Sequence, residues 1–114
     1  MNAQQHFDYV EAHPTDTGGL MALVALQTVR RVYTLAVTFP DTYPSAMPKV
    51  FVRRPTLEYS PHQFPHDRIC YLHPSFWNPG RHDLRFVIAR AAKWLAKYEV
   101  FRARGCWPGA GIDH

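Results

Sequence analysis

The chain has 114 residues, of which 46% are hydrophobic and 14% aromatic, which suffices for one modest core and predicts a single domain over residues 1–114. Its formal charge of +4 comes from scattered basic residues, a pattern more typical of a solvated face than of a nucleic-acid site, and its two cysteines, Cys70 and Cys106, exclude a framework of paired disulfides. No apolar run approaches the roughly 20 residues that cross a bilayer and the N-terminus has no signal-peptide pattern, so we expect a cytoplasmic protein without a membrane partner.

The first part of the sequence predicts three β-strands. Residues 7–12 alternate in polarity and run into a turn rich in Pro, Asp and Gly, which is typical of the first arm of a hairpin. Residues 20–29 and 32–39 follow as two further strands joined at Arg30-Arg31, and the second of these alternates cleanly. The spacing therefore predicts consecutive antiparallel strands.

A proline-rich stretch separates these strands from a fourth. Three prolines in residues 40–48 remove backbone donors and fix φ, so we expect a structured loop there. Residues 49–54 then supply a short strand that completes a meander of four antiparallel strands. Such a meander needs another element to cover one of its faces.

The C-terminal part predicts one long amphipathic helix that covers this face. Asp83 is placed to cap its start, and Gly105 is placed to end it after Arg104. The apolar residues that recur at helical spacing are Leu84, Val87, Ile88, Ala91, Leu95 and Tyr98. The tail beyond is too rich in Gly and Pro to continue the helix, and it is either mobile or packs Trp107 against the body. The predicted fold class is α+β, a four-stranded antiparallel meander covered by one long helix.

Residues 60–79, with the sequence SPHQFPHDRICYLHPSFWNP, concentrate the side chains that bear chemistry. Tetrahedral zinc is one interpretation, because His62, His66, Cys70 and His73 are suitable ligand types at steps of four, four and three residues. Prolines in the same stretch oppose the regular helix that would align these residues, and neither C-x-x-C nor H-E-x-x-H is present. A zinc-binding domain is therefore kept as an alternative.

Cys70 also fits the pattern of a reactive thiol. Histidines flank it and Arg68 and Arg81 make its loop electropositive, a setting that lowers a thiol pKa. A protease mechanism has little support, since only Asp67 and Asp83 are available to orient a base and no nucleophile motif is present. The other interpretation is a buried, inert core thiol within the apolar sequence RICYL.

Three motifs occur in a fixed order along the chain. FPDTYPSAMPKV, residues 39–50, is followed by Ser60-Pro61-His62, then by Cys70 eight residues later, and then by Trp77-Asn78-Pro79. This order resembles the ubiquitin-conjugating enzymes, whose F-P-x-x-Y-P-x-x-P-P-x-V motif matches here except for Met47. In that family His-Pro-Asn precedes the cysteine that accepts ubiquitin as a thioester, so the resemblance puts His62 at the asparagine position.

The resemblance covers about residues 7–100 and implies a UBC-like fold shortened at both ends. About six residues precede the first predicted strand, so the family's N-terminal helix, which helps to dock the activating enzyme, is not expected. Compact chains with this histidine-rich loop are similar to prokaryotic relatives in antiphage systems, including the stand-alone conjugating proteins of CBASS operons. The resemblance then implies that the carried group is the C-terminus of a ubiquitin-like protein or of a cGAS-like nucleotidyltransferase.

The activity that the resemblance implies is acyl transfer. Cys70 would hold the acyl group as a thioester and yield it to an amine, while His62 would donate a hydrogen bond to the oxyanion and accept a proton. His73 is a second candidate, as is His66, although both suit a loop-stabilising role. No phosphate-binding glycine motif is present, so the chain is expected to use no cofactor and to need an activating enzyme or a pre-activated donor. A catalytically silent UBC-like scaffold remains the further alternative.

Overall fold

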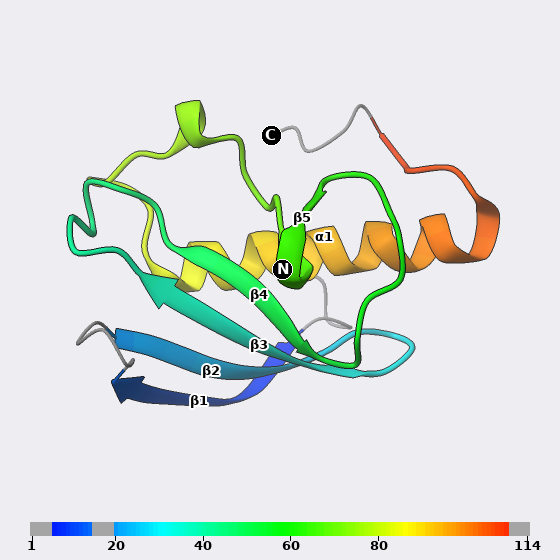
Figure 1. Cartoon of the computed structure of the whole chain (residues 1–114), viewed down its shortest axis with the longest axis horizontal. Helices are drawn as coiled ribbons and strands as arrows, with labels where there is room; N and C mark the ends of the chain where they lie inside the picture. The colour runs from blue at the N-terminus through cyan, green and yellow to red at the C-terminus, as the bar shows by residue number, and fades with distance from the viewer. Residues whose placement is uncertain (1–5, 15–19, 110–114) are drawn as a thin grey trace.

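The structure is a computed structural model that describes the backbone of residues 6–14 and all atoms of residues 20–109. Six strands lie in one sheet: β1 (His6–Pro14), β2 (Leu20–Gln27), β3 (Val32–Phe39), β4 (Lys49–Arg54), β5 (Gln63–Phe64) and β6 (Arg68–Ile69). The helical elements are two short 3₁₀ turns, η1 (Pro65–Asp67) and η2 (Pro74–Phe76), and the long helix α1 (Leu84–Arg104). Figure 1 shows α1 running along one side of the sheet.

The order of strands in the sheet is β1-β2-β3-β4-β6-β5, and all neighbours are antiparallel. The predicted α+β fold, with a four-stranded meander followed by one long helix, is confirmed. The hairpin β5–β6 extends the sheet beyond the meander and was not predicted. Each of its strands has two residues, which is too short for an alternating pattern to show in the sequence.

The core lies between the sheet and α1. Alternate residues of the central strands point inward and are almost fully buried, among them Val24 on β2, Leu35 on β3 and Val50 on β4. They pack with the stripe of α1 that includes Val87 and Leu95. Inward-facing residues at every second strand position, and at helical spacing on α1, explain why the sequence pattern predicted these elements correctly.

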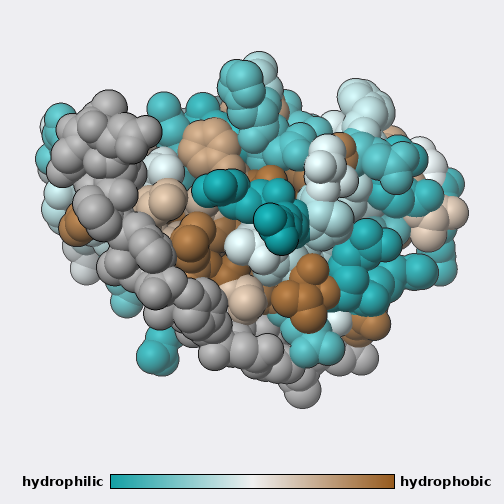
Figure 2. All heavy atoms as spheres, turned by 60° about the horizontal axis from the view of Figure 1, so that its bottom comes forward, coloured by the Kyte–Doolittle hydropathy of each residue, from teal (hydrophilic) through white to brown (hydrophobic). Residues whose placement is uncertain are grey.

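The opposite face of the sheet is only partly polar. Met21, Leu23 and Ala25 on β2 alternate with the core residues and are half-buried. When the bottom of Figure 1 is turned toward the viewer, apolar surface is visible among hydrophilic residues (Figure 2). No helix among the described residues has the length and apolar character needed to span a membrane.

Both ends of α1 have the predicted caps. Asp83 Oδ1 accepts a hydrogen bond from the Phe86 amide at 2.9 Å, which satisfies one free donor of the first turn. At the other end Gly105 adopts φ +81°, and its amide donates to the Phe101 carbonyl at 2.7 Å. A residue with a Cβ is disfavoured in this left-handed conformation, so glycine ends the helix there.

Candidate functional site

Cys70 follows β6 at the point where the chain leaves the sheet edge. Its neighbours Ile69 and Tyr71 are each 2% exposed and anchor the segment in the core, whereas Cys70 itself is half-buried. The Tyr71 hydroxyl donates to the Pro48 carbonyl at 2.6 Å. The proline-rich loop that carries the FPDTYPSAMP sequence is thereby joined to the cysteine segment.

His62 lies directly across the β5–β6 hairpin from Cys70. The Cys70 amide donates to the His62 carbonyl at 3.0 Å, and the indole Nε1 of Trp94 on α1 donates to the same oxygen at 3.2 Å. His62 has φ +63°, a left-handed conformation that is uncommon for a residue with a Cβ. Two donors therefore hold the backbone of His62 beside Cys70 and against the helix.

The ring of His62 packs edge-on against the indole of Trp107, with 5.1 Å between centroids. Trp107 comes from the tail beyond α1 and also contacts Trp94 at 5.4 Å and Phe101 at 6.4 Å. Its Nε1 atom is buried and has no hydrogen-bond partner among the described residues. Of the two alternatives for the tail, the packing of Trp107 against the body is the one observed.

His73 lies elsewhere on the loop. Its Nδ1 accepts from the Ser75 amide at 3.2 Å and lies 2.8 Å from the Ser75 hydroxyl, so the side chain caps η2. Its ring is 6.1 Å from that of Phe76. The structure thus places the backbones of His62 and Cys70 side by side, and it gives His73 local partners within η2.

The zinc alternative is not supported by the positions of the four proposed ligands. Among the described residues, which include all four, no three His, Cys, Asp or Glu side chains are arranged to hold a metal ion. His62 packs on Trp107 and His73 caps η2, while His66 is exposed in η1 with φ +66°. The prolines and the left-handed residues break the regular spacing that would have aligned the ligands.

The thiol of Cys70 is not activated by its surroundings in the way that the sequence suggested. Burial raises the pKa of the Cys70 thiol, and the nearby Arg68 guanidinium, which acts in the opposite direction, does not outweigh it. Arg68 stacks on the ring of Phe64 at 4.5 Å from the centroid. The expected lowering of the thiol pKa is therefore wrong, because partial removal from water disfavours the thiolate more than one arginine stabilises it.

Sequence reasoning did not identify Trp94 as part of this region, and it considered Asp67 only as a group that could orient a base. Trp94 lies on α1 among apolar residues and is 3% exposed. Its place in the helical pattern therefore predicted a core residue and nothing more. Asp67 Oδ2 accepts from the Leu57 amide at 3.1 Å and fixes the loop that leads into the hairpin. Hydrogen bonds between segments so far apart in sequence leave no local signal.

Comparison with known proteins gives one match. A family model described as Type II CBASS E2 protein matches residues 1–114. No curated protein and no solved structure matches the chain. The family match covers the cysteine hairpin together with the meander and the helix.

Proposed function

The chain belongs to the Type II CBASS E2 protein family over its whole length, and from this premise we propose that Cys70 carries an acyl group as a thioester. The family has a UBC-like conjugation role in antiphage defence, with partners in a conjugation pathway such as an activating enzyme. The proposal adds the residue that bears the acyl group, the residue that assists it and the proteins that are joined.

The chemistry consists of two acyl transfers at Cys70. In the first, Sγ attacks an activated C-terminal carbonyl, a C–S bond forms, and the activating group leaves with its electron pair. In the second, a lysine amine attacks the thioester carbonyl, a C–N bond forms, and the C–S bond breaks to release the Cys70 thiolate. The amine loses a proton during this step, and the thiolate takes one up afterwards.

The observation that carries the proposal is the hydrogen bond between the Cys70 amide and the His62 carbonyl. It supports the proposal because the backbone of His62, which stands where the ubiquitin-conjugating enzymes have asparagine, lies beside that of the cysteine. We assign to His62 the donation of a hydrogen bond to the oxyanion of each tetrahedral intermediate. The raised pKa of Cys70 means that the thiol arrives protonated at neutral pH, so a proton acceptor is needed, and His62 is the histidine held beside it.

His73 remains a second candidate, but its contacts with Ser75 favour a role in shaping η2. We propose that the carried group is the C-terminus of a ubiquitin-like protein or of a cGAS-like nucleotidyltransferase, as the resemblance to conjugating proteins of CBASS operons implies. The activating step belongs to a separate enzyme or to a pre-activated donor. A catalytically silent scaffold with the same fold is the competing function, and the presence of Cys70 at the acceptor position argues against it.

The test is a charging assay with the purified proteins of the same operon and ATP. We expect an adduct that disappears in gels run with reductant, that is absent in Cys70→Ser and that persists in Cys106→Ser. Cys106 is a matched control because it is the other free cysteine and is exposed. An adduct that survives in Cys70→Ser, or no adduct in a reaction where the donor is demonstrably activated, would favour the scaffold.

A further inference from the structure

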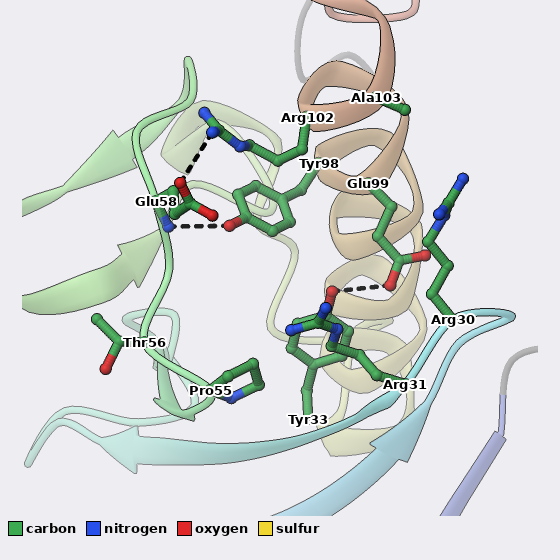
Figure 3. Close-up of a pocket in the computed structure, with 10 residues that line it drawn as sticks. All are labelled: Arg30, Arg31, Tyr33, Pro55, Thr56, Glu58, Tyr98, Glu99, Arg102 and Ala103. Atoms are coloured by element: carbon green, nitrogen blue, oxygen red, sulfur yellow. Dashed lines mark hydrogen bonds and ion pairs between the residues drawn. The ribbon is translucent and has the colours of Figure 1, made fainter.

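Two adjoining hollows lie where the C-terminal end of α1 meets the turn between β2 and β3. The first, of about 210 Å³, is bordered by α1, by Arg30 and Arg31 of the turn and by Pro55, Thr56 and Glu58 (Figure 3). The second is more open and shares Arg31, Pro55 and Thr56 with the first. Together they form a continuous concave surface that the proposed thioester chemistry does not use.

This surface concentrates the positive charge of the molecule. Its cations are Arg30, Arg31, Arg53, Arg54 and Arg102, called here the arginine surface. All five side chains are exposed. Of these five, Arg102 is the one with an ion pair to another described residue, Glu58, at 2.9 Å. Glu58 and Glu99 are the acidic residues of the lining, so three net positive charges remain, out of +4 for the whole chain.

The turn that carries Arg30 and Arg31 is held rigidly. The Thr28 hydroxyl accepts from the amides of Arg30 and Arg31 at 3.2 and 3.3 Å, and it donates to the buried carboxylate of Glu99 on α1 at 2.5 Å. Glu99 also accepts from the Tyr33 hydroxyl at 2.7 Å (Figure 3). A fixed backbone lowers the entropy lost when the two arginines bind a partner.

The composition of this surface matches a protein partner better than a nucleic acid. All five cations are arginines, which are enriched in protein interfaces and also suit phosphate groups, so the preference for a protein rests on the apolar side chains beside them. Exposed apolar side chains lie in and beside the turn, with Val29 65% and Val32 51% exposed.

The arginine surface is linked to the cysteine hairpin. Thr56 and Glu58 border the first hollow, and the amide of Leu57 between them donates to Asp67, three residues before Cys70. Along α1, Trp94, which holds His62, and Arg102 are eight residues apart, or about 12 Å. This spacing is short enough for one protein to contact both the arginine surface and the region of Cys70.

We infer that the arginine surface docks an acidic face of the activating enzyme, the protein that supplies the acyl group to Cys70. This inference rests on the proposed thioester function. The supplying protein is favoured over the acceptor because an acceptor brings a lysine to the thioester, and five arginines repel an approaching cation. Docking through charge raises the rate of encounter, and this rate falls as salt screens the charges.

The experiment measures binding separately from chemistry. The Cys70→Ser protein is titrated with the purified activating enzyme and with the purified nucleotidyltransferase of the same operon, at 50 and 200 mM salt. Arg53→Glu/Arg54→Glu reverses two charges of the arginine surface. These two residues border the second hollow, whereas Glu99 borders the first. Arg85→Glu/Lys93→Glu reverses two exposed charges elsewhere on the molecule and is the matched control, and Arg53→Gln/Arg54→Gln serves if the reversal impairs folding, as judged by circular dichroism.

We expect Arg53→Glu/Arg54→Glu to weaken association with the activating enzyme at least tenfold at 50 mM salt, with a smaller effect at 200 mM, while the control changes it less than threefold. Arginine-dependent association with the nucleotidyltransferase alone would overturn the inference. In the charging assay with unmutated Cys70, KM should rise and kcat should stay near its original value. Equal weakening by both double variants, or unchanged binding in the arginine variant, would overturn the inference. A single-stranded or duplex oligonucleotide that binds in an Arg53- and Arg54-dependent manner when neither protein does so would overturn it in favour of nucleic acid.

Different results would contradict the proposed docking surface and the proposed thioester function. Arginine-dependent binding without any thioester at Cys70 would contradict the proposed function and support the docking surface. A thioester that forms equally well in the arginine variant would support the function and contradict the docking surface.

Discussion

At the scale of single residues, His62 combines an unusual backbone with a central position. Its backbone is left-handed, and its carbonyl accepts hydrogen bonds from the Cys70 amide and the Trp94 indole. The His62 ring takes no part in these two bonds. Backbone and side chain therefore have separable roles. A substitution that keeps the backbone tests the ring alone.

We predict that His62→Gly slows the discharge of a preformed Cys70 thioester to free lysine by about 100-fold, the order of loss when one oxyanion donor is removed. Glycine adopts the left-handed conformation readily, so the hydrogen bonds to the carbonyl are retained. His62→Asn restores a donor on a side chain that tolerates this conformation, and should recover part of the rate. The rate is followed in single-turnover reactions on non-reducing gels.

His66→Gly is the matched control for this substitution. His66 is also a left-handed histidine, but it is exposed in η1, so the same change there should leave discharge within about twofold of the original rate. Equal rates for His62→Gly and the unmutated protein would show that His62 acts only through its backbone. The oxyanion role would then have to be withdrawn.

At the scale of elements, the regular parts of the fold were predictable and the cysteine hairpin was not. β3 and β4 have the predicted bounds, and α1 begins and ends at the predicted caps, because alternation, helical spacing and capping residues are local in sequence. The hairpin instead depends on Trp94 and Asp67, whose partners lie 32 and 10 residues away. The eight-residue spacing of His62 and Cys70 can be seen in the sequence. The burial that raises the pKa of the Cys70 thiol cannot, because it depends on how the chain folds.

The tail beyond α1 is the element whose function the sequence left open, and its contact with His62 suggests a role in positioning that ring. We predict that Trp107→Ala slows thioester discharge about tenfold while alkylation of Cys70 by iodoacetamide keeps its rate. Trp107→Phe retains an aromatic ring, so the rate of thioester discharge should fall less than in Trp107→Ala. The readouts are the same discharge assay and the alkylation of Cys70 in the Cys106→Ser background.

Combining His62→Gly with Trp107→Ala tests whether Trp107 acts by positioning the His62 ring or through a separate effect on the structure. If Trp107 acts through the His62 ring, His62→Gly/Trp107→Ala should discharge as fast as His62→Gly alone, because coupled residues are not additive. A tenfold further loss in the double variant would mean that Trp107 acts independently of His62. Thermal melts accompany each variant, since Trp107 also packs on Trp94 and Phe101.

At the scale of the whole molecule, two buried tyrosines join distant segments. Tyr33 on β3 donates to Glu99 on α1, and Tyr71 after β6 donates to the loop before β4. Burial raises the pKa of both hydroxyls well above the ordinary value near 10, and the hydrogen bond and the charge of Glu99 add to this effect for Tyr33. Each hydroxyl therefore keeps its proton to a higher pH in the folded protein than in the unfolded chain.

Stability should therefore fall in alkaline solution. Above about pH 10 the unfolded chain loses the protons that folded Tyr33 and Tyr71 retain, so the free energy of unfolding decreases by about 1.4 kcal/mol per pH unit for each tyrosine. Urea unfolding at pH 9, 10 and 11 measures this slope. The Cys70→Ser background is used, because the raised pKa of the thiol acts in the same direction. Tyr71→Phe should remove about half of the slope, whereas Tyr59→Phe, at a position 75% exposed, should leave it unchanged. A stability that stays level from pH 9 to pH 11 would contradict the assignment of these two hydroxyls as the buried links between sheet, loop and helix.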